Sequence, residues 1–122
     1  MRTADHVLRT FAFAAERDLP VFLLGGGSNV LFPDEGFPGL VLQVALQGIE
    51  VARNDETILV KAAAGEDWDR IVSMAVEKGW AGIECLSGIP GLVGATPIQN
   101  VGAYGQEVGQ SIIEVEAYDR LP

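Results

Sequence analysis

The sequence predicts an α+β domain in which helices pack against a mostly antiparallel sheet. Two segments with the apolar spacing of an amphipathic helix, residues 4–17 and 67–78, are separated and followed by short strand-like runs. No internal repeat or low-complexity linker divides the chain, and 122 residues suit one domain with a hydrophobic core. Apolar residues make up 48% and charged residues 20% of the chain, a composition that excludes disorder.

The two predicted helices are defined by their apolar faces. In residues 4–17 this face consists of Val7, Leu8, Phe11, Ala14 and Ala15. In residues 67–78 it consists of Trp68, Ile71, Val72, Ala75 and Val76. The second helix is expected to follow an acidic cluster, Glu66, Asp67 and Asp69, that suits a helix N-terminus and needs no metal. Trp68 and Trp80 are expected to anchor this helix against the sheet.

The strands are predicted from apolar runs and from alternation of apolar with polar residues. In chain order they are residues 21–24, 40–46, 49–53, 57–63 and 112–118. A turn at residues 54–56 makes a hairpin of the third and fourth strands. The last strand rests on Ile113, Val115 and Ala117, which alternate with Glu114, Glu116 and Tyr118.

Charge and composition narrow the class of partner. The net charge is −9, and the eight basic residues are scattered, which disfavours nucleic acid. No apolar run approaches the ~20 residues that cross a bilayer, and the N-terminus shows no signal-peptide pattern, so a cytoplasmic protein is expected. The lone Cys85 fits a reducing compartment and is expected to be a small buried core residue. Because the chain has one His and one Cys, a zinc site is excluded.

A first glycine run, residues 25–29 (GGGSN), directly follows the predicted strand 21–24. Successive backbone N–H groups in such a run can turn toward one anionic ligand. The dinucleotide fingerprint of a Rossmann fold is absent because Val30 stands where a glycine is required, and the Gly-Lys-Ser/Thr of a Walker loop is also missing. The alternative to phosphate binding is a tight glycine turn between core strands.

A second, longer glycine run covers residues 88–105 and contains no charged residue. A loop of this length without charge is expected to pack against something. Two interpretations stay open, an ordinary buried connection and an apolar wall for a flavin ring with backbone amides reaching its heteroatoms and phosphates. Taken together, the two runs favour a large phosphate-bearing cofactor that is held from both sides.

Several segments resemble the flavin-binding domain of the UDP-N-acetylenolpyruvoylglucosamine reductases (UDP-N-acetylmuramate dehydrogenases). The matching segments are residues 24–31, 64–68, 82–84 and 89–105. Residues 25–29 alone are shared with the wider family of vanillyl-alcohol-oxidase-type flavin oxidases, whereas residues 97–105 are far more specific to the reductases. The resemblance implies an FAD-binding fold of the vanillyl-alcohol-oxidase/PCMH type.

The resemblance also implies which residues contact FAD. The pyrophosphate would lie against Gly25, Gly26, Gly27, Ser28 and Asn29, with Ala95 and Thr96. Ala95 would offer only its amide, since relatives more often carry a small hydroxyl residue there. The path from adenine to flavin would be lined by Ile89, Gly94, Ile98, Gln99, Asn100, Gly102, Ala103 and Tyr104. For Tyr104 a plain core aromatic is the alternative.

The reductases move hydride from NADPH to FAD and then to a UDP-sugar in peptidoglycan precursor synthesis. Their catalytic residues match nothing in this chain, so none is assigned, and the chain is expected to be a partial FAD-binding domain, inactive alone. It would lack the N-terminal strand and the C-terminal substrate domain, which leaves a sheet edge open to self-association. The alternatives are a non-catalytic domain that binds another phosphate ligand or serves as a scaffold, and a flavin oxidase, which residues 98–105 disfavour.

Overall fold

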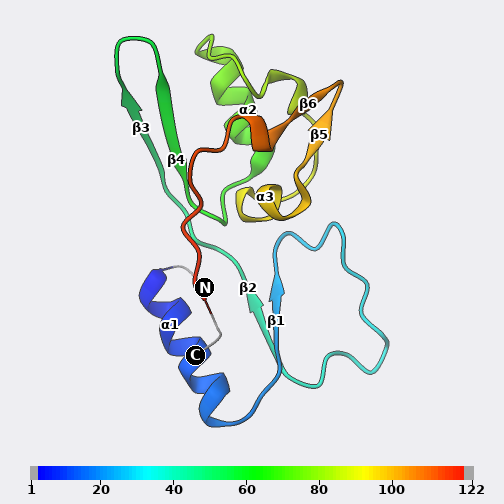
Figure 1. Cartoon of the computed structure of the whole chain (residues 1–122). Coiled ribbons are helices and arrows are strands. Elements are labelled where there is room, and N and C mark those ends of the chain that lie inside the picture. The colour runs from blue at the N-terminus through cyan, green and yellow to red at the C-terminus, as the bar shows by residue number, and fades with distance from the viewer. Residues whose placement is uncertain (1–2, 120–122) are drawn as a thin grey trace.

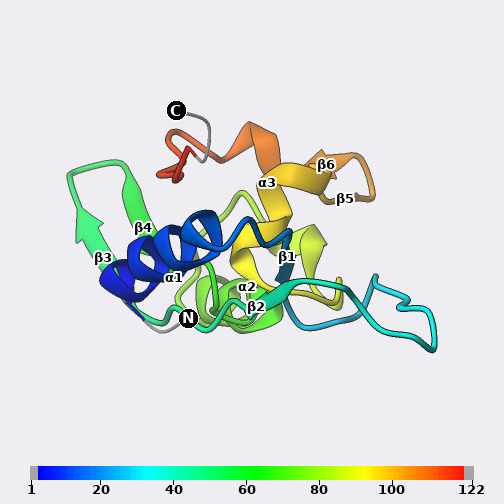
Figure 2. The same cartoon turned by 90° about the horizontal axis from the view of Figure 1, so that it is seen from below.

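The structure is a computed structural model that describes residues 3–119 (Figure 1). In chain order its helices and strands are α1 (Ala4–Glu16), β1 (Val21–Leu24), β2 (Leu40–Gln43), β3 (Ile49–Arg53), β4 (Ile58–Ala62), α2 (Trp68–Glu77), α3 (Thr96–Gln99), β5 (Gly102–Ala103) and β6 (Gln106–Glu107). Single 3-10 turns lie at η1 (Glu84–Leu86), η2 (Val93–Ala95) and η3 (Val108–Gln110). One end of the molecule holds α1, β1 and β2, and the other holds the remaining elements (Figure 1). Figure 2 shows the molecule from the end that holds α1.

The strands form three separate pairs. β1 and β2 are parallel, with Val21 opposite Leu40, because the long loop between them returns the chain to the same end. β3 and β4 form the expected antiparallel hairpin, and β5 and β6 form a second, shorter one. The expectation of one mostly antiparallel sheet is therefore not confirmed: two of the pairs are antiparallel, but no ladder among residues 3–119 joins the three pairs.

Both predicted long helices are confirmed, and each begins at a side-chain cap. Thr3 Oγ1 accepts the N–H of His6 at 3.2 Å, and Asp67 Oδ1 accepts the N–H of Arg70 at 3.0 Å. Val76 departs from the predicted apolar face, because its side chain is 52% exposed. Neither α1 nor any shorter helix within residues 3–119 has the length and hydropathy of a bilayer span.

The core lies between α2 and the segment that follows it. Trp68, Val72, Leu86, Val101 and Val108 form one buried cluster. The indole N–H of Trp68 donates to the carbonyl of Leu86 at 3.0 Å, so this side chain anchors α2 to η1 and the second glycine run. The predicted anchorage of Trp68 against the sheet is wrong. Cys85, next to this cluster, is half-buried and not fully enclosed as expected.

The predicted last strand is also wrong. Residues 112–119 run without a ladder from η3 past β4 to α1 (Figure 1). They are held there by the ion pair of Lys61 and Glu116, 3.3 Å apart, and by the stacked rings of Phe11 and Tyr118. Alternation predicts which side chains share a face, but a strand also requires a partner edge at hydrogen-bonding distance.

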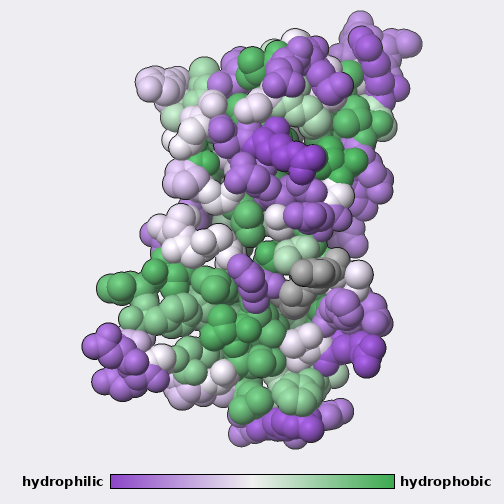
Figure 3. All heavy atoms as spheres, turned by 180° about the vertical axis from the view of Figure 1, so that it is seen from behind, coloured by the Kyte–Doolittle hydropathy of each residue, from purple (hydrophilic) through white to green (hydrophobic). Residues whose placement is uncertain are grey.

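Large apolar side chains are exposed at the β1–β2 end of the molecule. Seen from behind, apolar residues gather on the lower half of the surface (Figure 3). Leu31 is 97% exposed, and Leu23 and Val41 of the two paired strands are 48% and 40% exposed. The molecule therefore keeps much of its apolar area at this end in contact with solvent.

Candidate functional site

The first glycine run is open to solvent at the end of β1. A Cβ added at Gly26 or Gly27 would meet no heavy atom within 4 Å, and Gly27 has φ +82°, a backbone conformation that favours glycine. Within the described chain, no backbone N–H of residues 25–29 donates to a backbone carbonyl. These groups are therefore available to an anionic ligand.

The second glycine run is more ordered than a loop. It contains η2, the one-turn helix α3 and the strand β5, which the sequence analysis did not predict. The expectation that it packs against something is confirmed, because Ile89, Val93 and Ala103 lie against the buried cluster around Trp68. Its backbone is therefore built into the core along one side.

The two runs meet. The nearest heavy atom to a Cβ built on Gly25 is Leu92 Cδ1, at 3.7 Å, which is ordinary van der Waals contact. Leu92 immediately precedes η2, so the predicted contact residues of the second run start next to the first run. The structure thus brings together the two segments that the sequence analysis singled out.

A ladder of hydrogen bonds fixes the second run to residues 64–69. The amide of Gly94 donates to Ala64 at 2.9 Å, that of Val93 to Glu66 at 2.9 Å, and that of Trp68 to Gly91 at 3.0 Å. Gly94 has no room for a side chain, since an added Cβ would lie 2.7 Å from the Cβ of Ala64. The segment that leads into α2 is therefore the support on which the second run lies.

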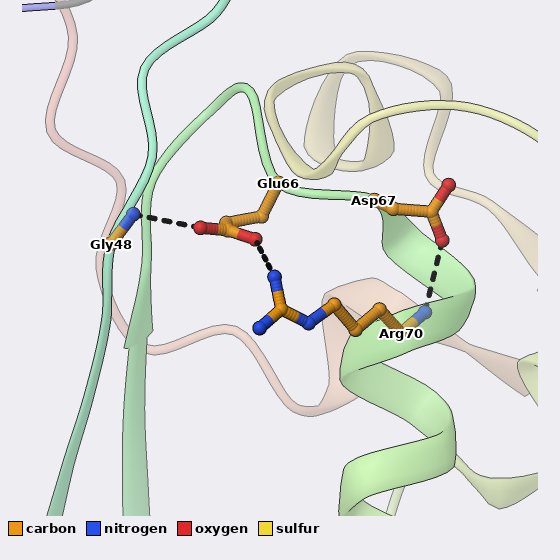
Figure 4. A network of polar contacts seen from close by, with 4 residues as sticks. All are labelled: Gly48, Glu66, Asp67 and Arg70. Atoms are coloured by element: carbon orange, nitrogen blue, oxygen red, sulfur yellow. Dashed lines mark hydrogen bonds and ion pairs between the residues drawn. The ribbon is translucent and has the colours of Figure 1, made fainter.

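Glu66 extends this support to the β3–β4 hairpin (Figure 4). Its side chain is only 5% exposed, accepts the amide of Gly48 at 2.8 Å and pairs with Arg70 at 3.1 Å. Of the predicted acidic cluster, Asp67 caps α2 as expected, but Glu66 is a buried connector that sequence reasoning missed. Its position, between the apolar stretch ending at Ala64 and the buried Trp68, was the available signal.

The predicted contact side chains differ in how free they are. Thr96 is buried and its hydroxyl donates to Val93 at 2.9 Å, so in this arrangement it has no hydrogen to offer a ligand. Asn100 bonds the side chain of Glu107 and the amide of Gly109, at 3.0 and 3.1 Å. Both side chains serve the scaffold.

Two predicted contact residues project outward. Ile98 is 85% exposed and Tyr104 is 94% exposed, so the alternative of Tyr104 as a core aromatic is wrong. Tyr104 has φ +53° and Gly105 has φ +80° at the two-residue turn between β5 and β6. This is the type I′ geometry, in which Asn is common at the first position and a tyrosine is unusual.

Acidic side chains are absent from both runs. Residues 25–33 and 88–106 carry no Asp or Glu, although the whole chain has a net charge of −9. Two carboxylates outside the second run hydrogen-bond it, that of Asp69 at the amide of Gly88 and that of Glu107 at the side chain of Asn100. The amide of Gly88 and the hydroxyl of Ser87 lower the pKa of Asp69, and local backbone amides, including that of Gly82, lower the pKa of Glu84. No group of His, Cys, Asp or Glu in residues 3–119 could hold a metal ion.

Comparison with known proteins identifies the family. Residues 1–120 match the family described as FAD binding domain. The chain belongs to this family. Membership agrees with the expected FAD-binding fold of the PCMH type and with FAD as the ligand.

The relatives of this FAD-binding domain are longer proteins. Over 120 residues it is 50% identical to the UDP-N-acetylenolpyruvoylglucosamine reductase of Salinispora arenicola (strain CNS-205). The matched region covers 98% of this chain and 33% of the relative. The proteins of the same name from Thermobifida fusca (strain YX) and Streptomyces coelicolor (strain ATCC BAA-471 / A3(2) / M145) are 46% and 52% identical, over 97% of this chain and 33% and 30% of their own lengths. The chain thus spans about a third of the length of the curated relatives it matches.

Proposed function

We propose that this chain binds FAD between the two glycine runs, as the FAD-binding part of an NADPH-dependent UDP-N-acetylenolpyruvoylglucosamine reductase. The observation that carries the proposal is the position of Leu92, the nearest neighbour that a Cβ built on Gly25 would meet, which brings two segments distant in the sequence close together. The relatives named above support the reaction class. We also propose that the chain is a partial domain of such an enzyme.

The residues present fit the cofactor. A pyrophosphate needs donors, and residues 25–29 contain no Asp or Glu and offer amides that make no backbone bond among residues 3–119. The carboxylates of Asp69 and Glu107 bond the second run at Gly88 and Asn100. The hydroxyl of Ser28 and the amide of Asn29 add side-chain donors, and both residues are exposed. Opposite them, residues 89–104 present an apolar surface on a fixed backbone.

Each set of residues would have its own task. Gly25, Gly26, Gly27, Ser28 and Asn29 would bind the pyrophosphate together with the amides of Ala95 and Thr96. Ile89, Gly94, Ile98, Gln99, Asn100, Gly102, Ala103 and Tyr104 would line the adenine and flavin, with Ile98 and Tyr104 excluding water from its outer side. Bound FAD would supply hydride transfer.

The whole reductase would use NADPH and a UDP-sugar, neither of which is assigned residues here, and would serve cell-wall synthesis, cell shape and division. We assign no catalytic residue to this chain and expect it to bind FAD without turnover. The half-buried free thiol of Cys85 is compatible with a cytoplasmic site of action.

A matched pair of glycine variants tests the site. Gly27 and Gly36 have φ of +82° and +80°, and an added Cβ at either would meet nothing within 4 Å. Gly27→Ala and Gly36→Ala therefore cost similar backbone strain, but only the first alters the amides of residues 25–29. Titration of FAD by flavin fluorescence is expected to show about tenfold weaker binding for Gly27→Ala and no change for Gly36→Ala. The expected loss corresponds to one charge-assisted hydrogen bond.

The second candidate is a non-catalytic domain that binds another phosphate ligand or serves as a scaffold. It is favoured by Thr96 and Asn100, whose side chains already bond the protein. Absence of saturable FAD binding by the folded chain, or equal weakening by both glycine variants, would favour this candidate.

Self-association is a further part of the proposal. Each ladder has two strands, so every strand keeps a free edge among the described residues, and such edges pair readily with another chain. We expect light scattering after size-exclusion chromatography to show a concentration-dependent increase in mass. A constant monomer mass at high concentration would remove this part and leave FAD binding untouched.

A further inference from the structure

Asp69 holds the beginning of the second glycine run. One carboxylate oxygen, Oδ1, accepts the hydroxyl of Ser87 at 2.9 Å and the amide of Gly88 at 2.7 Å. Asp69 lies in the first turn of α2, where the helix dipole favours a negative charge. Both bonds are charge-assisted, which makes them stronger than bonds between neutral groups.

These bonds complete the ladder between residues 64–69 and the second run. From the other end, Ala64, Glu66 and Trp68 bond the run through their backbones. Asp69 is the member of the ladder that bonds the run through its side chain, and a substitution can therefore remove its contribution without changing the backbone. Beyond Gly88 the ladder leads to Leu92, whose Cδ1 would lie 3.7 Å from a Cβ built on Gly25.

We infer that Asp69 is a positioning residue that fixes the second glycine run in the conformation that receives the cofactor. Its hydrogen-bond partners, Ser87 and Gly88, are not among the residues predicted to contact FAD, and it acts through them. This inference rests on the proposed FAD site. The position of the run also determines local hydrogen exchange, which can be measured without FAD.

The chain provides a matched control at the same helix terminus. Asp67→Ala removes the cap of α2, the bond to the amide of Arg70, and leaves the contacts of Asp69 in place. Asp69→Ala removes the contacts with Ser87 and Gly88 and leaves the cap. Asp69→Asn retains an oxygen acceptor without the charge and serves as the conservative variant.

The experiment is amide hydrogen exchange by NMR on the whole chain, followed by FAD titration. In Asp69→Ala we expect the amides of residues 88–94 to exchange about tenfold faster relative to those of β1 and β2, because a charge-assisted hydrogen bond is lost. Asp69→Asn should restore part of the protection, and Asp67→Ala should leave the ratio unchanged. FAD should bind Asp69→Ala several-fold more weakly than the unmodified chain.

The outcomes separate the inference from the proposed function. Equal exchange changes in Asp69→Ala and Asp67→Ala would overturn the positioning role, because Asp69 would then only stabilise the helix. Faster local exchange with unaltered FAD affinity would overturn the link to the cofactor. Faster local exchange in a chain that binds no FAD at all would overturn the proposed function and keep Asp69 as the residue that fixes the run.

Discussion

The two glycine runs come close together at Gly25 and Leu92 but differ in how their backbones are bonded. Residues 25–29 donate no backbone hydrogen bond to a carbonyl of residues 3–119, and side chains added at Gly26 or Gly27 would point into open space. Four hydrogen bonds join the second run to residues 64–69. The amides of Gly88, Val93 and Gly94 donate from the run, and the amide of Trp68 donates to the carbonyl of Gly91. The run also packs on the core.

This difference assigns different tasks to two segments of similar composition. Donors without partners are suited to a ligand that brings its own negative charge. A segment that is already fixed loses little conformational entropy when a ring packs against it. Glycine content alone predicts neither behaviour, because glycine permits both a free turn and a close approach of two backbones.

The largest expected effect on stability comes from a side chain added where Gly94 lies closest to Ala64. Gly94→Val would place a Cβ 2.7 Å from that of Ala64, and we expect the free energy of unfolding to fall by about 2–4 kcal/mol. Gly26→Ala should change it by less than about 0.5 kcal/mol. Urea unfolding measures both, and similar losses at the two positions would contradict the contrast between the runs.

A smaller loss is expected from the support beneath the second run. Glu66→Ala leaves the amide of Gly48 without its acceptor, which costs about 2 kcal/mol. Most of this cost belongs to that amide, because the side chain of Arg70 is 67% exposed and its ion pair contributes little. Glu66→Gln keeps an acceptor and should lose less than half as much. A larger loss in Arg70→Ala than in Glu66→Ala would argue against this division.

Tyr104 tests whether the second run gives up stability for binding. Its positive φ and its 94% exposure mean that Tyr104→Asn should stabilise the fold by about 0.5–1 kcal/mol. The same variant should weaken FAD binding if the ring covers the cofactor. Tyr104→Phe is the control and should leave stability unchanged. Thermal unfolding measures the stability and FAD titration the affinity of the same samples. A Tyr104→Asn variant less stable than the unmodified chain would exclude strain in the turn.

The smallest effect is the acid dependence of stability. Asp69 and Glu84 have pKa values below their ordinary 3.8 and 4.5 because amides, led by Gly88 for Asp69, donate to the charged forms. Their contribution is therefore complete above the ordinary values and is lost as the pH falls through the lowered ones. Unfolding midpoints between neutral pH and about pH 3 should fall less in Asp69→Asn/Glu84→Gln than in the unmodified chain. Equal slopes would contradict this.

The sequence predicted what depends on local periodicity. α1, α2 and the β3–β4 hairpin appeared within a residue or two of their observed bounds, because apolar spacing and caps act over a few positions. The four-residue helix α3 was missed because it is too short to show a period and includes Pro97. The contact residues named for FAD remain a prediction, derived from resemblance.

Contacts between distant segments could not be read from the sequence. The spacing of Trp68 predicted burial but not its partner, which is the carbonyl of Leu86. Asp69 fitted a helix N-terminus equally well whether or not it reached Ser87. The strand predicted at residues 112–118 failed for the same reason, since a pattern of side chains contains no information about which backbone lies beside it.

The nearness of Leu92 to Gly25 also determines when the proposed cofactor site can form during folding. The helices and the β3–β4 hairpin join near neighbours in the chain and can form early, whereas residue 92 must close a long loop before it reaches residue 25. The two halves of the site are thus made separately and meet late. A dinucleotide added at the start of refolding would find donors on one segment and an apolar surface on another, but no pocket between them until that loop has closed.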